Sequence, residues 1–470
     1  MRFLRAFIAA VLLSALGYLA MVALGLAYPP LRLFGLLTQF LGVPWLFQII
    51  HSIFGLGQGG KIFAFTGVTL LWLGGLTLMG GLARPLLAGL IAALLTIGLA
   101  PWGLALAYGA AFGLLLWALS PLSLRGPRAS APGDPQRRAV TLALTGGGVA
   151  LAAGGLTGLF RQTGGAAATP AVTAGGPLPF GVTPVKDFYY VSKNLEAFDP
   201  QVNGDRWSLK VGGLVKNPRS FSLADLKSFE PVRSERTLAC ISNPVGGPLI
   251  SNGIWEGFRL ADLLRQVGVQ GGARYLLWEA ADGYTESLPL GEALDPEILL
   301  VHSLNGAALN HKHGFPLRVL IPGRYGMKQP RWITGIRLSA EDEPGYWVQR
   351  GWSKTARIEL TSRIDVPAET TASALAGQPG FIRGVAFYGE KPITKVEVTT
   401  DGGQTWQRAR LIQPRTKFAW TLWELPWNPE AGPHQLAARA YSGSLVQKVA
   451  DKDALPEGAT GYHHFIVNAS

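Results

Sequence analysis

Residues 237–257 read TLACISNPVGGPLISNGIWEG and contain the one cysteine of the chain, Cys240. A loop rich in Asn, Pro and Gly follows it directly, and such residues form turns and let the backbone approach a ligand closely. A cysteine in this setting is a nucleophile, a ligand for a soft metal, or a small buried hydrophobic side chain. A single cysteine excludes an intramolecular disulfide, and no Cys-x-x-Cys pair or Cys/His cluster indicates zinc or an iron–sulfur site.

A second segment, His311 to Ile336, reads HKHGFPLRVLIPGRYGMKQPRWITGI. Arginine forks, imidazole groups and the backbone amides of glycine turns are the groups that bind phosphate. His313, Arg318, Lys328 and Arg331 supply these residue types around a glycine turn. The segment therefore predicts an anion-binding site.

Together, these two segments resemble the cofactor-binding regions of the sulfite oxidase family of molybdopterin oxidoreductases, and the resemblance covers about residues 186–468. It implies that Cys240 ligates molybdenum. An earlier segment, DFYYVSKN, matches the family's first cofactor contact, although the family pattern is closer to Phe-Val-Arg-Asn-His. The cofactor contacts that the resemblance implies are Tyr190, Val191, Ser192, Lys193, Asn194, Asp282, His313, Arg318, Gln329, Pro330 and Arg331.

The resemblance also implies a redox enzyme that transfers an oxygen atom, with Cys240 and Lys193 as its catalytic residues. Family members that oxidise sulfite surround it with arginines, one of them five positions after the cysteine, where this chain has Val245. Lys193 replaces another, and Thr416 and Lys417 stand near the third. Lysine is a point charge without arginine's planar fork. We expect oxidation of sulfite or a related sulfur compound, with reduction of a neutral sulfoxide or N-oxide as the alternative.

Two other classes of protein fit single features of the sequence. A cysteine hydrolase would use Cys240 as nucleophile and His302 or His313 as base, and leaves the HGFPLR segment unexplained. A membrane-anchored binding protein without catalytic activity would account for the C-terminal part alone. The net charge of +12 does not indicate nucleic-acid binding, because the chain has no basic tract interleaved with aromatic residues.

The apolar residues are concentrated before position 160. Residues 6–27 form an uncharged apolar run about long enough to cross a bilayer as a helix. Four more runs predict spans, at 62–82, 85–100, 102–119 and 139–160, so that residues 1–160 form an all-α transmembrane bundle of about five helices. Residues 31–55 contain polar side chains and predict an interfacial or re-entrant stretch.

Arginines at positions 2, 5, 84, 125, 128, 137 and 138 all fall on one side of this arrangement, which the positive-inside rule makes cytoplasmic. The part after residue 160 is then extracytoplasmic, on the periplasmic side of an inner membrane. Residues 161–185 are rich in Gly, Ala, Thr and Pro and predict a flexible linker.

The soluble part divides in two by its pattern. Residues 186–364 mix strand-like segments with short helices, among them FSLADLKSF capped by Ser222, and predict an α+β molybdopterin domain. Residues 365–470 alternate in short segments between Gly, Asp and Pro turns, which predicts an antiparallel β-sandwich. The stretch VEVTTDGGQTWQRA is similar to the family's immunoglobulin-like dimerisation domain, so the resemblance implies a homodimer.

The electron partner is expected outside the chain. His51 is the one histidine before residue 300, whereas haem between membrane helices commonly needs two, and the soluble part has no c-type haem motif. We expect molybdenum and molybdopterin without haem in this chain, and a cytochrome, a separate haem subunit or quinone as electron carrier.

Overall fold

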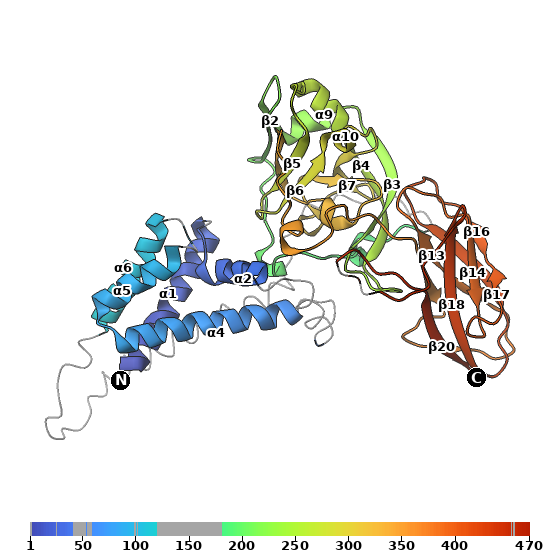
Figure 1. Ribbon diagram of the computed structural model, residues 1–470, viewed down its shortest axis with the longest axis horizontal. Helices are drawn as coiled ribbons and strands as arrows, with labels where there is room; N and C mark the ends of the chain where they lie inside the picture. Colours follow the sequence, from blue (N-terminus) through green and yellow to red (C-terminus); the bar gives the residue numbers. More distant parts are fainter. Residues whose placement is uncertain are drawn as a thin grey trace. The chain divides into compact units, whose positions relative to one another are not determined.

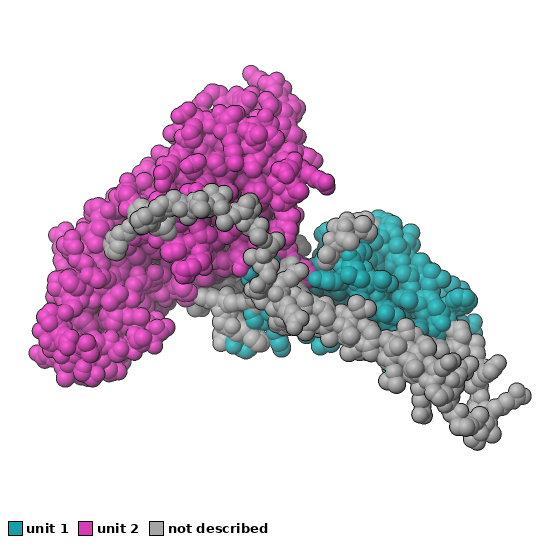
Figure 2. Space-filling model, turned by 180° about the vertical axis from the view of Figure 1, so that it is seen from behind, with its two compact units in different colours: residues 1–167, 195–197 teal, residues 168–194, 198–470 magenta. Residues whose placement is uncertain are grey.

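The computed structural model describes residues 2–24, 26–40, 53, 59–97, 100, 102–119, 181–452, 454 and 456–470. The chain divides into two compact units, residues 1–167 with 195–197 and residues 168–194 with 198–470 (Figure 2). The first is helical and the second is built mainly of strands (Figure 1).

The first unit contains the helices α1 (Arg2–Leu24), α2 (Pro29–Phe40), α4 (Gly59–Leu82), α5 (Pro85–Ile97) and α6 (Trp102–Ala118). A shared cluster of buried side chains joins α1, α4, α5 and α6. Helices α5 and α6 approach closely because glycines face each other: a Cβ at Gly109 would lie 2.5 Å from the carbonyl oxygen of Gly89. Small residues at such contacts are typical of helices that pack in lipid.

Among the residues that the structure describes, two helices are long and apolar enough to cross a membrane, Arg2–Met21 and Gly59–Leu82. Helix α5 has 13 residues, about 20 Å at the helical rise, against a hydrocarbon layer of roughly 30 Å. The prediction of a five-helix bundle is thus supported for two spans, while α5 and α6 are apolar helices of less than spanning length.

The predicted span 139–160, His51 and most of the linker 161–185 lie outside the described residues, and α2 occupies the first part of the stretch 31–55.

Residues 208–339 of the second unit form two sheets with short helices. One sheet has the order β2-β1-β10-β5-β6 and the other the order β3-β4-β7-β8, with β9 paired to β7. The strands are β1 (Ser208–Gly213), β2 (Arg219–Ser222), β3 (Val232–Ala239), β4 (Ile250–Arg259), β5 (Tyr275–Ala280), β6 (Thr285–Pro289), β7 (Leu299–Leu304), β8 (Ala307–Ala308), β9 (Arg318–Leu320) and β10 (Ile333–Ser339).

Short helices cover this α+β core. They are α8 (Leu223–Lys227), α9 (Leu260–Val267) and α10 (Leu290–Ala293), with the single-turn helices η2 (Val185–Asp187), η3 (Glu196–Phe198), η4 (His311–His313), η5 (Gly326–Lys328) and η6 (Val348–Arg350). The predicted cap of α8 is confirmed: the Ser222 hydroxyl accepts from the Asp225 amide at 3.1 Å, and the Asp225 carboxylate accepts from the Ser222 amide at 2.8 Å. The core itself consists of large apolar side chains such as Phe258 and Trp278, each 1% exposed.

The C-terminal part is the predicted β-sandwich. One sheet has the order β11-β13-β17-β16 and the other β12-β20-β18-β14-β15, with β19 paired to β18. The strands are β11 (Thr361–Val366), β12 (Ser373–Ala374), β13 (Gly380–Phe387), β14 (Lys395–Thr399), β15 (Gln407–Arg408), β16 (Arg410–Ile412), β17 (Thr421–Trp427), β18 (Gly432–Ser442), β19 (Leu445–Val446) and β20 (His463–Ala469). The predicted antiparallel pairing is found between the long strands, and the short strand β12 pairs with β20 in parallel.

Candidate active site

Cys240 directly follows β3 and opens a closed loop, residues 240–249, which we call the Cys240 loop. The amide of Cys240 donates to the carbonyl of Leu249 at 2.9 Å, which closes the base of the loop. The side chain of Asn243 accepts from the Leu249 amide at 2.8 Å, and the Cys240 sulfur lies 3.0 Å from the Ser242 hydroxyl. These local bonds hold a half-buried thiol at a defined place at the end of a strand.

Tyr189 packs beside the thiol. Burial, and secondarily the neighbouring Cys240, raises the pKa of Tyr189, so its phenol stays neutral. Gly326 makes room for it, since a Cβ there would lie 2.7 Å from the Tyr189 hydroxyl and 3.5 Å from the carbonyl of Ala239. The glycine turn of the second motif is thereby brought against the end of the strand that leads to the cysteine.

Arg318 is a buried cation beside this pair. Arg318 is 5% exposed. One of its guanidinium nitrogens donates to the His313 carbonyl at 3.3 Å, and the guanidinium carbon lies 5.2 Å from the Trp255 ring centroid. Burial, followed by the charge of Arg331, lowers the pKa of Arg318 to about 9. Its Nε has no hydrogen-bond partner, and no carboxylate pairs with it, among the described residues. An uncompensated buried guanidinium is a binding site for an anion.

His313 lies at the end of η4, which Asn310 caps by accepting from the His313 amide at 2.9 Å. Burial, followed by the positive charge of Arg318, lowers the pKa of His313 to about 4, so the ring is neutral near pH 7. Its Nε2 lies 3.4 Å from the carbonyl oxygen of Val185. Because a carbonyl only accepts, Nε2 carries the proton and Nδ1 is left as an acceptor, which suits an N–H group of a pterin.

Arg331 connects the two predicted segments. Its guanidinium donates to the carbonyls of Lys312, at 2.5 Å, and Val191, at 2.8 Å. It also lies 5.0 Å from the ring centroid of Tyr190 and 4.3 Å from that of Trp332. The structure thus brings Tyr190, Val191 and Arg331 together, although they are far apart in sequence.

Asp199 organises the first cofactor segment, and the sequence analysis missed it. This carboxylate is 5% exposed, accepts from the Ser192 hydroxyl at 2.7 Å and from the Asn194 amide group at 3.0 Å, and also accepts from the Tyr190 hydroxyl. Asn194 donates in addition to Asp282 at 3.3 Å. One buried acidic residue therefore fixes three of the predicted cofactor contacts, and no local sequence signal marks it.

Lys193 is held by Asp282. Its ammonium donates to the Asp282 carbonyl at 2.8 Å and lies 3.5 Å from the Asp282 carboxylate. Burial lowers the pKa of Lys193, and the charge of Asp282 opposes that shift. The Asp282 carboxylate also accepts from the Tyr284 amide at 3.0 Å. Asp282 therefore both stabilises the turn at residues 282–284 and orients the Lys193 ammonium.

Three further residues complete this side of the site and were not predicted. Tyr284 is buried and donates to the Met327 carbonyl at 2.5 Å. Arg350 lies with its guanidinium carbon 3.6 Å from the ring centroid of Tyr346, and the Lys193 ammonium is 5.1 Å from the same centroid. Arg350 is 8% exposed, and its Nε has no partner in the described part of the chain. An arginine among the aromatic residues of GYWVQRGW was the available signal.

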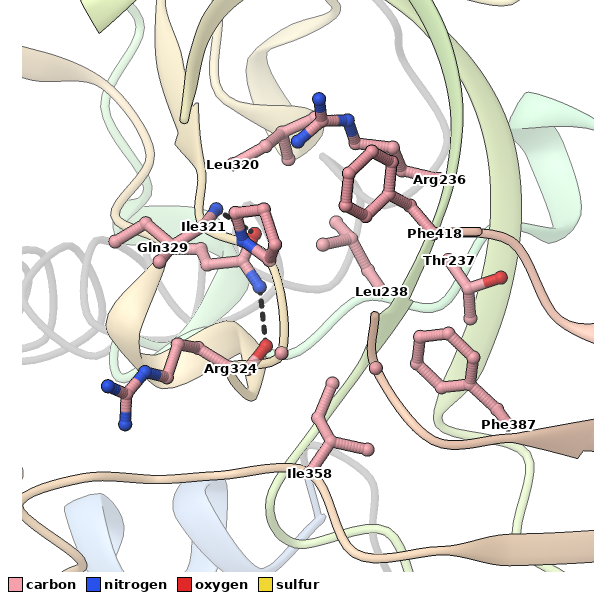
Figure 3. A pocket seen from close by; sticks show the side chains of 13 residues that line it. Arg236, Thr237, Leu238, Leu320, Ile321, Arg324, Gln329, Ile358, Phe387 and Phe418 are labelled. Carbon is pink, nitrogen blue, oxygen red and sulfur yellow. Dashed lines mark hydrogen bonds between the residues drawn. The ribbon is translucent and has the colours of Figure 1, made fainter. Parts of the chain in front are cut away.

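Gln329 has its side chain committed to the backbone. Its carbonyl accepts from the Ile321 amide at 3.0 Å and its amide donates to the Arg324 carbonyl at 2.7 Å, as the dashed lines of Figure 3 show. It lines a small pocket whose walls include residues of β3, β9 and the sandwich. A cofactor contact from Gln329 would therefore come from its main chain, and Pro330 already accepts from the Val319 amide through its carbonyl at 3.1 Å.

The hydrolase interpretation needs a histidine directed at the thiol. His302 instead interacts with the charges of Lys227 and Glu256, and burial lowers its pKa. The proton-bearing nitrogen of His313 faces Val185. By contrast, Tyr189 interacts with Cys240 and with the buried Arg318, which has no carboxylate partner among the described residues, and this arrangement fits a soft metal carried by an anionic pterin.

Comparison with known families decides between these interpretations. The family model described as "Oxidoreductase molybdopterin binding domain" matches residues 196–347, and the one described as "Mo-co oxidoreductase dimerisation domain" matches residues 353–451. The chain belongs to the sulfite oxidase family of molybdopterin oxidoreductases. It is an enzyme that uses molybdenum bound to molybdopterin, and the hydrolase and binding-protein alternatives fall.

Relatives of known name agree. An uncharacterised oxidoreductase of Bacillus subtilis, YuiH, is 35% identical over 147 residues, covering 31% of this chain and 72% of that protein. Sulfite oxidase of Arabidopsis thaliana is 28% identical over 324 residues, covering 57% of this chain and 82% of that protein. The sulfane dehydrogenase SoxCD of Paracoccus pantotrophus shares the fold, with a TM-score of 0.54 and 21% identity over 62% of this chain and 84% of that chain.

The uncompensated charge of Arg318 leads to a prediction about cofactor binding. In Arg318→Met, a similar apolar volume replaces a cation that has no carboxylate partner in the described part of the chain. The cofactor-free variant should therefore unfold at no lower a temperature than cofactor-free wild type, while bound molybdenum falls at least tenfold, as loss of a charge-assisted contact predicts. Molybdenum per chain, measured by mass spectrometry, and thermal unfolding test this, with the exposed Arg337→Met as control. Wild-type molybdenum content in Arg318→Met would contradict it.

Proposed function

We propose that this chain is a membrane-anchored enzyme that oxidises sulfite, or a related small sulfur oxyanion, at a molybdopterin cofactor bound through Cys240. The observation that supports this most directly is the buried Arg318, uncompensated by any carboxylate in the described residues, in the same cluster as Cys240 and Tyr189. The further proposed cofactor contacts are the residues named for the first segment, with Asp282, His313, Gln329, Pro330 and Arg331.

Two cations would recognise the substrate. Lys193 and Arg350 both lie against the ring of Tyr346, and the charge of Arg350 contributes to the lowered pKa of Lys193, so their charges act on the same region. Arg350 has an unused Nε donor within the described part of the structure. A small dianion placed between them would relieve this repulsion and satisfy that donor.

At two other positions, sulfite-oxidising family members have arginines, but this chain supplies no comparable charge at the substrate there. Val245 is apolar. Thr416 donates its hydroxyl to the carbonyl of Glu235, and the Lys417 ammonium lies 4.9 Å from the ring centroid of Phe418. Arg350 is therefore our candidate for the charge that Val245 does not supply.

The mechanism follows from these roles. The molybdenum cofactor supplies oxygen-atom transfer and takes up two electrons when sulfite and water become sulfate and two protons. Asp282 orients the Lys193 ammonium by its carbonyl and carboxylate, and Arg350 adds a fixed charge stacked on Tyr346. The neutral phenol of Tyr284, anchored on the Met327 carbonyl, closes this side against water.

A second candidate function is reduction of a neutral sulfoxide or N-oxide. Two observations favour it: the ion pair with Asp282 offsets the charge of Lys193, and Val245 makes the Cys240 loop less cationic than in sulfite oxidisers. Both reactions belong to the same cofactor chemistry. Steady-state assays of sulfite oxidation and sulfoxide reduction distinguish them.

Membrane attachment and assembly are part of the proposal. Two helices of spanning length and the arginine distribution support an inner-membrane anchor with the catalytic part on the periplasmic side. We place the linker at 161–185 and the domains at 186–364 and 365–470. The match of residues 353–451 to a dimerisation domain supports a homodimer through the sandwich. Electrons would pass to a separate cytochrome, haem subunit or quinone.

The ligand assignment of Cys240 is tested by Cys240→Ser. A hydroxyl is a poor replacement for a soft thiolate on molybdenum, so turnover should fall at least a thousandfold while the far-ultraviolet circular dichroism stays that of wild type. Turnover within tenfold of wild type would end the assignment.

Substrate recognition is tested by Lys193→Ala and Arg350→Met. Each should raise KM for sulfite roughly tenfold, because each removes one charge-assisted contact, with a smaller change in kcat. Lys210→Ala, on the exposed side of β1, is the control. Vigorous sulfite oxidation that is insensitive to both substitutions would show that the proposed anion pocket is wrong.

The external electron partner is tested by absorption spectroscopy. The single chain, purified from membranes of a haem-competent host, should show no Soret band, since His51 is the one histidine before residue 300. A Soret band equivalent to one haem per chain would show that this chain binds haem itself, and would contradict the prediction.

A further inference from the structure

The Cys240 loop is contacted at its far end by the sandwich. The guanidinium of Arg363, on β11, donates to the carbonyl of Gly247 at 2.9 Å. The same group donates through Nε to Asp365 at 2.6 Å, so the carboxylate orients the fork toward the loop. Along β11, Ser362 and Ile364 point into the sandwich core, which leaves Arg363 and Asp365 on the outward side.

An irregularity in β11 contributes to this orientation. Ile364 pairs with Gly384 and Val366 pairs with Arg383, so Asp365 is an extra residue in the strand. Bulges of this kind bend a strand and change the direction of its side chains. Here the bulge lies directly after the arginine that reaches the loop.

A histidine from β20 holds the loop beside this contact. A Cβ at Gly246, whose φ is +72°, would lie 2.1 Å from a carbon of the His463 ring, so the ring packs directly on the glycine backbone. The ring is held at both nitrogens: Nδ1 accepts from the Ile364 amide at 3.0 Å, and Nε2 lies 3.2 Å from the Glu369 carboxylate. Since Nδ1 accepts, Nε2 carries the proton and donates to Glu369.

Several other bonds of the loop are internal to it. Asn243 bonds to Leu249, and the amide of Gly247 donates to the Pro244 carbonyl at 3.0 Å. Such bonds give the loop its shape but do not place it relative to the rest of the protein. Placement needs contacts from outside, and Arg363 and His463 supply two at adjacent residues.

We propose that Arg363 and His463 are positioning residues for the metal ligand: they fix the far end of the Cys240 loop and thereby the direction in which the sulfur faces the molybdenum. The sandwich is then part of the active-site architecture of its own chain, in addition to any role in dimerisation. The proposal concerns the cysteine ligand and is independent of which substrate is oxidised.

The test uses the full-length chain and its single cysteine as reporter. Arg363→Met keeps the apolar stem and removes both hydrogen bonds, whereas Arg363→Lys keeps one donor. Arg383→Met is the matched control, because Arg383 bonds to Glu424 within the sandwich. In chains purified without cofactor, alkylation of Cys240 by iodoacetamide should be about tenfold faster in Arg363→Met than in wild type, because a charge-assisted bond to the loop is lost. In Arg363→Lys and in Arg383→Met the alkylation rate should stay near that of wild type.

The holoenzyme supplies a second readout. The Mo(V) paramagnetic resonance signal depends on the sulfur ligand's orientation, so its g values should shift in Arg363→Met and return toward wild type in Arg363→Lys. Asp365→Asn, which releases the guanidinium without touching the loop, should change both readouts in the same direction. Wild-type alkylation rates and g values in Arg363→Met and Asp365→Asn would overturn the proposal.

Discussion

The molybdopterin domain has to accommodate a buried positive charge that its described residues do not neutralise. The positive charge of Arg331 contributes to the lowered pKa of Arg318, and Arg318 is buried against Trp255. Burying a charge without a counter-ion is unfavourable, so the rest of the domain has to hold these groups in place. A ligand that binds only the folded chain stabilises it, and an anionic cofactor at this position would complete a charge balance that the polypeptide leaves open.

The parts of the site that could be predicted are those written in consecutive residues. The Cys240 loop and the segment from His311 to Ile336 could be singled out as candidates because turn residues, side chains of the types that bind phosphate and a thiol occur close together in the sequence. Asp199 carries no such mark. Its partners lie close by in the chain, but nothing in a single sequence says that an ordinary aspartate will be buried under a tyrosine, a serine and an asparagine.

The positions of the N-terminal helices could be predicted from the sequence, but their lengths could not. Apolar content correctly indicated helices at α1, α4, α5 and α6, but composition does not set where a helix ends. Helix α5 stops after 13 residues, and its close approach to α6 depends on glycines that also read as ordinary small apolar residues. The sandwich was easier, since alternation of buried and exposed residues with frequent turns is a property of each strand by itself.

The segment that precedes β17 has a consequence for solubility. Strand β3 is the outer strand of its sheet, and its last five residues are buried. The sandwich covers this edge: the Thr237 amide donates to the Phe418 carbonyl at 2.9 Å, and the Trp420 amide donates to the Thr237 hydroxyl at 2.8 Å. The unpaired backbone groups of an uncovered edge strand are a template for pairing with other chains. The sandwich therefore shields part of this edge, and removing it would expose the strand that leads to Cys240.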